Sequence, residues 1–67
     1  MNIPNEIERI EARVREAGFP VAKLLRVAEV DVAQWQRWKK GQQDPRIGTW
    51  SKIQRALDDL LSPEKAA

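Results

Sequence analysis

The stretch VAKLLRVAEVDVAQWQRWKKG, residues 21–41, predicts two short helices joined by a tight turn. In its first half Leu24 and Ala28 stand one helical turn apart. In its second half Trp35 and Trp38 have the spacing of two residues that share one face of a helix. The rest of the chain is expected to pack around this pair of helices.

Two residues mark the ends of the second helix of this pair. Asp31 is a favourable N-cap because its carboxylate can accept hydrogen bonds from the free N–H groups of the following turn. Gly41 can adopt the left-handed conformation that ends a helix. A helix over about residues 32–40 has the length typical of the second helix of a helix-turn-helix motif, so the stretch is interpreted as a DNA-reading unit.

A first helix precedes this unit, and its apolar residues recur at spacings of four and three: Ile3, Ile7, Ile10, Val14 and Ala17. It is expected to begin near Pro4, or at Asn5 in a capping-box pattern with Glu8, and to end at Gly18. Charged residues are expected to fill its other sides: Glu6, Glu8, Arg9, Glu11, Arg13, Arg15 and Glu16. The stripe could serve a coiled-coil partner, but its short length favours packing within the domain.

A fourth helix is expected over about residues 47–61, after a polar loop that contains Asp44 and Pro45. Its apolar positions repeat at helical period: Ile47, Trp50, Ile53, Leu57, Leu60 and Leu61. Ser62 and Pro63 end it, and residues 62–67 form a tail. With the second helix at about 20–27 and no strand-like alternation, the prediction is one all-α, four-helix domain spanning residues 1–67.

Composition narrows the possible functions. The 67 residues include no Cys and no His, which argues against disulfides, zinc-finger ligands, a thiolate nucleophile and the commonest general base. We therefore expect no metal, no cofactor, no small-molecule ligand and no enzymatic activity. No apolar run approaches the roughly 20 residues of a membrane span, and the first residues lack the layout of a signal peptide, so a cytoplasmic protein without a membrane partner is expected.

The charge is unevenly distributed although the net charge is only +2. Residues 37–55 contain six Lys or Arg residues against the single acid Asp44, which gives this segment a charge of +5. A basic excess that begins inside the second helix of the unit is typical of a surface that contacts phosphates. The alternative is an ordinary solvated helix face.

The apolar pattern resembles the helix-turn-helix domain of the lambda repressor and Cro family. Counted from Val21, the family keeps apolar residues at the fourth, eighth, tenth, fifteenth and eighteenth places, which here are Leu24, Ala28, Val30, Trp35 and Trp38. The segment that follows also matches, with the run Arg37, Trp38, Lys39, Lys40 and Gly41 and then Pro45, Ile47, Trp50, Ile53, Ala56 and Leu57. The resemblance covers roughly residues 5–61. It implies a lambda-repressor-like domain with the helix-turn-helix at its second and third helices.

Two positions depart from the family pattern. The fifth place, usually a small residue where the two helices cross, is Leu25, which implies a wider or shifted crossing. The ninth place, usually Gly, is Glu29, for which we expect a positive φ at a cost of roughly 1–2 kcal/mol. The family's fifth helix also has no counterpart after Pro63.

The resemblance and the helical geometry together predict the residues that contact DNA. If the two tryptophans face the core, the candidate base readers are Val32, Ala33, Gln34, Gln36 and Arg37. The candidate phosphate contacts are Lys23, Lys39, Lys40, Gln42, Gln43 and Arg46, together with the N–H groups at the start of the second helix. For Val32 and Ala33 a role as ordinary helix residues is equally compatible with the pattern. The tryptophans could instead stack on single-stranded bases, although their spacing favours the core.

The resemblance further implies a small phage or prophage type of transcription regulator, a repressor or an activator, that binds double-stranded DNA as a homodimer on a palindromic operator. The candidate dimer interface is formed by Leu57, Leu60 and Leu61, whose alternative role is to close the core against the first helix. A competing hypothesis is a protein-interaction module that uses the same scaffold to dock polymerase or another regulator. An enzyme is disfavoured. The adjacent acids Asp58 and Asp59 point in different directions on a helix, so they do not form a pair of catalytic carboxylates.

Overall fold

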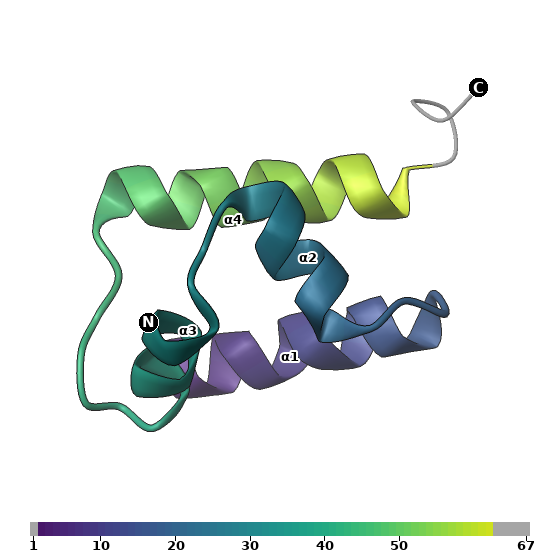
Figure 1. Cartoon of the computed structure of the whole chain (residues 1–67). Coiled ribbons are helices and arrows are strands. Elements are labelled where there is room, and N and C mark those ends of the chain that lie inside the picture. Colours follow the sequence, from purple (N-terminus) through teal and green to yellow (C-terminus); the bar gives the residue numbers. More distant parts are fainter. Residues whose placement is uncertain (1, 63–67) are drawn as a thin grey trace.

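The computed structural model describes residues 2–62, and these residues form four α-helices and no strand. The helices are α1 (Ile3–Glu16), α2 (Val21–Ala28), α3 (Val32–Lys39) and α4 (Ile47–Leu61) (Figure 1). The predicted all-α, four-helix class is confirmed, and α2 and α3 differ by one residue from their predicted limits. The predicted tail over residues 62–67 lies outside the described residues except for Ser62, which is the C-cap of α4.

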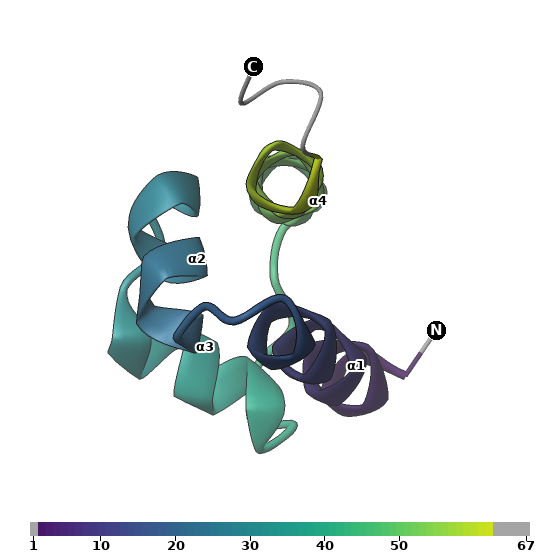
Figure 2. The same cartoon turned by 90° about the vertical axis from the view of Figure 1, so that its right-hand side faces the viewer.

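The helices pack mainly as two pairs, α2 on α4 and α3 on α1, while α1 also contacts α2 and α4. Figure 1 shows the two long helices α1 and α4 running across the molecule with α2 between them. Figure 2, viewed along α1 and α4, places both α2 and α3 on the same side of these helices. Because α3 is held chiefly by α1, most of its circumference lies at the edge of the fold.

All four helices and the turn before α3 contribute to one hydrophobic core: Ile7, Ile10, Val14, Leu24, Leu25, Ala28, Val30, Trp35, Trp38, Ile53, Ala56 and Leu57. Trp35 and Trp38 are 1% and 2% exposed, and their rings meet edge to face with centroids 6.2 Å apart. This is a favourable geometry for two aromatic rings. The predicted core placement of these two tryptophans is confirmed, and burial leaves neither ring face available for stacking on bases. Trp50 is half-buried and packs against the core.

Helices α1 and α3 begin with side-chain caps. Asp31 accepts a hydrogen bond from Ala33 N at 3.3 Å, as predicted. The predicted capping box of Asn5 and Glu8 is wrong, because Asn2 is the N-cap and its Oδ1 accepts from Asn5 N at 3.1 Å. The helix therefore begins one turn earlier than that pattern suggested, with Pro4 in the first turn, where proline removes no needed hydrogen bond.

Helices α1, α2 and α3 end in the same hydrogen-bond pattern. In each case the backbone N–H of a residue with positive φ donates to the carbonyl of the third residue before it. The N–H of the next residue donates to the carbonyl of the fifth residue before it, and the two bonds together form a Schellman motif. The positive-φ residues are Gly18 at 90°, Glu29 at 59° and Gly41 at 76°. Glu29 is the one non-glycine residue among residues 2–62 with positive φ, as the departure from the family pattern predicted. The turn between α2 and α3 thus carries backbone strain that the two glycine turns avoid.

Four expectations about the apolar stripes are corrected. Ala17, expected on the core face of the first helix, is its C-cap and is exposed. Ile47 is 87% exposed because, as the first residue of α4, it lies at the margin of the stripe and beyond the reach of the helices that cover Ile53. Leu57 is 2% exposed and belongs to the core, so it is not available for a dimer interface. Glu11, expected on the charged side of α1, is 4% exposed.

No helix in the described part of the chain is long and apolar enough to cross a membrane.

Replacing Glu29 with Gly is expected to raise the free energy of unfolding by about 1 kcal/mol, because glycine adopts the left-handed conformation without strain. For a domain of this size that corresponds to a rise in melting temperature of about 4–8 °C. The matched control is Gly18→Ala, which places a Cβ at the equivalent position after α1, where nothing lies within 4 Å of it. This control should lose stability. A lower melting temperature for Glu29→Gly would show that the Glu29 side chain stabilises the turn by more than the strain costs.

Candidate nucleic-acid interface

The outward face of α3 is formed by the side chains predicted to read bases. Trp35 and Trp38 attach one side of the helix to the core, and the helical period of 3.6 residues turns the opposite side toward solvent. All five predicted base readers are exposed: Val32, Ala33, Gln34, Gln36 and Arg37. Val32, at the first position of the helix, is 54% exposed.

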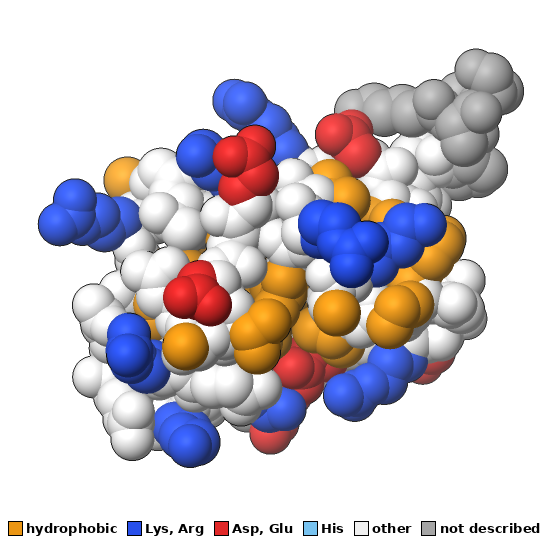
Figure 3. All heavy atoms as spheres, viewed as in Figure 1, with side chains coloured by type: hydrophobic (Ala, Val, Ile, Leu, Met, Phe, Trp, Pro, Cys, Tyr) orange, Lys and Arg blue, Asp and Glu red, His pale blue; other side chains and the backbone are white. Residues whose placement is uncertain are grey.

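The segment that connects α3 to α4 continues this surface. Figure 1 shows it looping outward at the left of the molecule, and Figure 3 shows Lys and Arg side chains distributed along the same edge. Lys40, Gln42, Gln43 and Arg46 are all exposed there, as expected for phosphate contacts. The backbone of the segment is fixed at its start, because Gln42 N donates to Arg37 O at 3.0 Å.

A polar hollow joins the two sets of predicted residues. It lies between the flank of α3, the connecting segment and the first turn of α4, and its lining is Gln34, Trp38, Gln43, Asp44, Pro45, Arg46 and Thr49. A predicted base reader, Gln34, and two predicted phosphate contacts, Gln43 and Arg46, therefore share one site. Thr49 and Asp44 were not among the predicted residues. Thr49 adds a hydroxyl, and Asp44 places a negative charge in the hollow that partly offsets Arg46.

Two of the predicted phosphate contacts have partners within the protein. The Lys23 ammonium lies 4.8 Å from the centroid of the Phe19 ring, near the start of α2. Lys39 is only half-exposed, and its Nζ lies 2.8 Å from Oε1 of Glu11. The prediction for Lys39 is therefore revised, because its charge is compensated inside the fold and its ammonium points toward α1.

Glu11 connects α1 to α3 through both oxygens of its carboxylate. Oε1 pairs with Lys39, and Oε2 accepts a hydrogen bond from Trp35 Nε1 at 3.0 Å. Burial raises the pKa of Glu11, whereas the hydrogen bonds from Lys39 and Trp35 and the positive charges of Lys39 and Arg15 lower it, and the net result is a pKa below the ordinary glutamate value. The carboxylate is therefore ionised at neutral pH even though it is buried.

The burial of Glu11 and its pairing with Trp35 were not predicted from the sequence, although the sequence contains two features that indicate them. Residue 11 lies four positions after Ile7 and three before Val14, so it belongs to the edge of the apolar stripe of α1. A tryptophan predicted to be buried also needs an acceptor for its indole N–H. An acid inside the stripe of one helix and a buried tryptophan in another together indicate such a pair.

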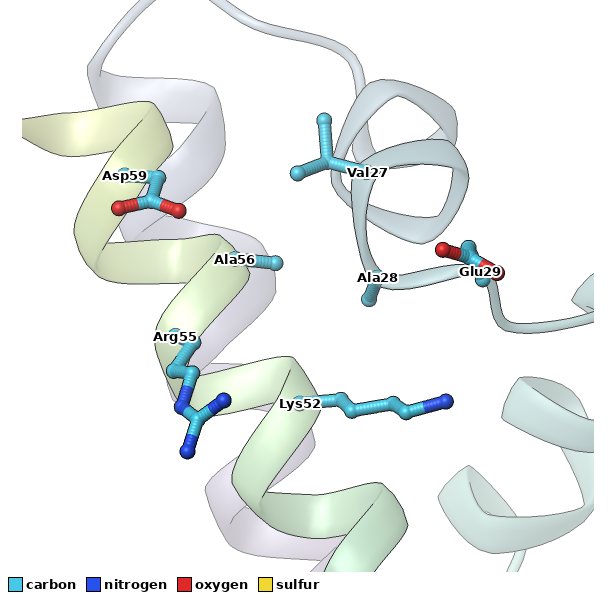
Figure 4. Close-up of a pocket in the computed structure, with 7 residues that line it drawn as sticks. All are labelled: Val27, Ala28, Glu29, Lys52, Arg55, Ala56 and Asp59. Carbon is cyan, nitrogen blue, oxygen red and sulfur yellow. The ribbon is translucent and has the colours of Figure 1, made fainter.

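A second hollow lies between α2 and α4, away from the predicted contact residues (Figure 4). Its lining is Val27 and Ala28 of α2 and the following residue Glu29, together with Lys52, Arg55, Ala56 and Asp59 of α4. The side chains of Val27 and Ala56 point into the space between the two helices, and both signs of charge surround it. This hollow contains none of the residues predicted to contact DNA.

Within residues 2–62 no group of three or more acidic, His or Cys side chains is placed to hold a metal ion. Comparison with known proteins finds no matching family model, no matching curated protein and no matching solved structure. The geometry of the α3 surface is therefore the basis for a functional proposal.

Glu11→Gln is expected to destabilise the protein most at neutral pH. Because the pKa of Glu11 is lower in the folded than in the unfolded state, the ionised carboxylate stabilises the fold above about pH 4.3, and this contribution is lost as the pH falls through the folded-state pKa. The difference in unfolding free energy between the two proteins, measured by urea denaturation from about pH 7 to about pH 3, should shrink toward the acid end. Glu8→Gln, on the exposed side of α1, is the control. A difference that stays constant with pH would contradict the role of the ionised carboxylate.

Proposed function

We propose that this protein is a sequence-specific transcriptional regulator that inserts α3 into the major groove of double-stranded DNA. The observation that carries the proposal is the one-sided attachment of α3. One face is buried through Trp35 and Trp38, and the whole opposite face is exposed at the edge of the fold. A helix held in this way has the dimensions that the major groove admits.

The chemistry of the exposed face supports base reading. An arginine at position 37 can donate two hydrogen bonds to guanine O6 and N7, and the amides of Gln34 and Gln36 can pair with adenine. The exposed methyl groups of Val32 and Ala33 lie in the first turn, the part of a recognition helix that approaches bases most closely, and suit a thymine methyl group.

We assign the arrangement of α2, the turn and α3 to the helix-turn-helix motif of the lambda repressor and Cro type. The support is the short length of both helices, the left-handed residue that follows α2, and the burial of Val30 between that residue and the Asp31 cap. Leu25 at the crossing is buried, and its carbonyl accepts a hydrogen bond from Val30 N at 2.9 Å. The larger side chain is thus accommodated within the core on this assignment.

Phosphate contacts would be provided around the outward face of α3. Lys40, Gln42, Gln43 and Arg46 are exposed along the connecting segment and would contact one strand of the duplex. Pro20, the N-cap of α2, offers no side-chain hydrogen bond, and Lys23 N donates to Pro20 O at 3.0 Å, so the N–H groups of Val21 and Ala22 are the ones that would face a second phosphate near Lys23. Such contacts supply affinity and orientation, while the choice of sequence comes from α3.

We further propose that the protein acts as a homodimer on a palindromic site. One short recognition helix contacts too few base pairs for useful selectivity, and a twofold axis doubles the number. Leu60 and Leu61, at the end of α4, are half-buried and remain the candidate interface after the assignment of Leu57 to the core.

The alternative is a protein-interaction module on the same scaffold. The feature that favours it is Ile47, which is 87% exposed beside the connecting segment and offers an apolar contact that DNA phosphates would not use. The alternatives differ in their response to salt. A module without DNA specificity would bind duplexes weakly and without sequence preference as the salt concentration falls, whereas a base-reading protein would keep its preference.

Arg37→Ala and Lys40→Ala are expected to affect DNA binding in different ways, although each removes one positive charge. Arg37→Ala should cost roughly 1–3 kcal/mol on the preferred sequence and relax the preference at one position of each half-site. Lys40→Ala should weaken binding equally on all sequences and reduce the slope of log affinity against log salt by about one unit. Fluorescence anisotropy with the preferred duplex and with single-base variants at several salt concentrations measures both effects.

Two results of this comparison would contradict parts of the proposal. If both variants weaken binding equally on every sequence, Arg37 contacts a phosphate and the preference has another source. If neither variant changes binding, α3 does not enter the groove. Lys52→Ala, which changes an exposed residue of α4, is the matched control for loss of a positive charge outside α3, and it should leave the sequence preference unchanged.

A further inference from the structure

We propose that Glu11 of α1 is a positioning residue for DNA recognition, because its single carboxylate holds two successive turns of α3 and thereby sets which side chains of α3 face outward. This inference rests on the proposed function. Glu11 would contact no DNA itself and would act through Trp35 and Lys39.

The two partners of Glu11 are four residues apart in α3 and therefore lie one above the other on the same side of that helix. Trp35 Nε1 reaches Oε2 at 3.0 Å, and Lys39 Nζ reaches Oε1 at 2.8 Å. A single bond would leave α3 free to pivot about the contact. Two bonds one turn apart fix both the rotation of α3 about its own axis and its position along that axis.

The burial of these groups makes the alternatives unfavourable. Glu11 and Trp35 are 4% and 1% exposed. If α3 rotated or slid by one residue, the carboxylate and the indole N–H would both lose their partners in a largely buried site, which is disfavoured. Apolar side chains of similar size could fill the same space without penalising such a shift. A charged residue in this place thus defines the position of α3 more sharply than an apolar one.

The position of α3 depends chiefly on its contacts with α1. Helix α1 is its principal packing partner, and the predicted base readers project from the side of α3 away from the core. A rotation of α3 would move Arg37 sideways relative to a base edge. Directional hydrogen bonds to bases tolerate such displacement poorly, whereas contacts to the phosphate backbone tolerate it well. Loss of the Glu11 contacts should therefore reduce sequence discrimination more than overall affinity.

The test uses the double variant Glu11→Leu with Trp35→Phe, which removes the carboxylate and the indole N–H together and so leaves neither unpaired. The preferred duplex, identified beforehand by selection with the unsubstituted protein, and a scrambled duplex of the same composition are titrated by fluorescence anisotropy. We expect the ratio of the two affinities to fall by about tenfold, equivalent to about 1.4 kcal/mol. Release of the Lys39 charge from Glu11 affects both duplexes alike and therefore cancels in this ratio. Glu8→Leu, an equal charge change on the exposed side of α1, should keep the full ratio.

Circular dichroism establishes that each variant is folded. If the double variant fails to fold, Trp35→Phe alone serves, because it removes only the indole bond and leaves the pair of Glu11 with Lys39. It should still lower the ratio measurably, and Glu11→Gln, which keeps an acceptor for Trp35, should lower it less. An unchanged ratio in a folded double variant or in folded Trp35→Phe would overturn the positioning role while leaving the proposed function intact. If the unsubstituted protein shows no preference between duplexes, the proposed function fails and this inference fails with it.

Discussion

The attachment of α3 to α1 is the contact on which the rest of the candidate interface depends. Trp35 and Trp38 bury one side of an eight-residue helix that is too short to be stable alone, and Glu11 fixes that helix through two of its turns. Because α3 is attached from one side, its other side is left for contacts outside the protein. The same arrangement pairs the half-exposed Lys39 with Glu11 and leaves Arg37 and Lys40 exposed. The contact between α1 and α3 thus determines both how α3 packs and which of its positive charges are exposed.

The turn between α2 and α3 shows a conflict between local and global requirements. Three helices end with the same pair of hydrogen bonds, and glycine occupies the left-handed position in two of them. Glu29 occupies the third, where the fold imposes a positive φ on a residue that disfavours it. The burial of Leu25 and Val30 on either side of Glu29 explains how the strained conformation is maintained. A domain of this size has little stability in reserve, so such strain is a substantial fraction of the total.

The features set by local patterns could be predicted from sequence. The four helices and the core positions of Trp35 and Trp38 follow from helical spacing, whereas the positive φ of Glu29 is what the resemblance to the lambda repressor and Cro family implies. The features that depend on which helices pack against each other could not be predicted. The burial of Glu11 requires that Trp35 and Lys39 lie opposite it, and the exposure of Ile47 requires that no helix covers the start of α4. The helical period places Leu57 on the apolar face of α4, but only the packing of α4 against α2 and α1 decides between core and interface.

The central claim, that the outward face of α3 reads double-stranded DNA, is tested most directly by selecting bound duplexes from a random pool. The selection is made with the full chain, and the enriched sequences are aligned. The account predicts one palindromic consensus whose two half-sites are centred about 10 base pairs apart, which is one turn of the double helix. Enriched sequences that share no motif beyond that of the starting pool, at a salt concentration where the protein does bind, would contradict it.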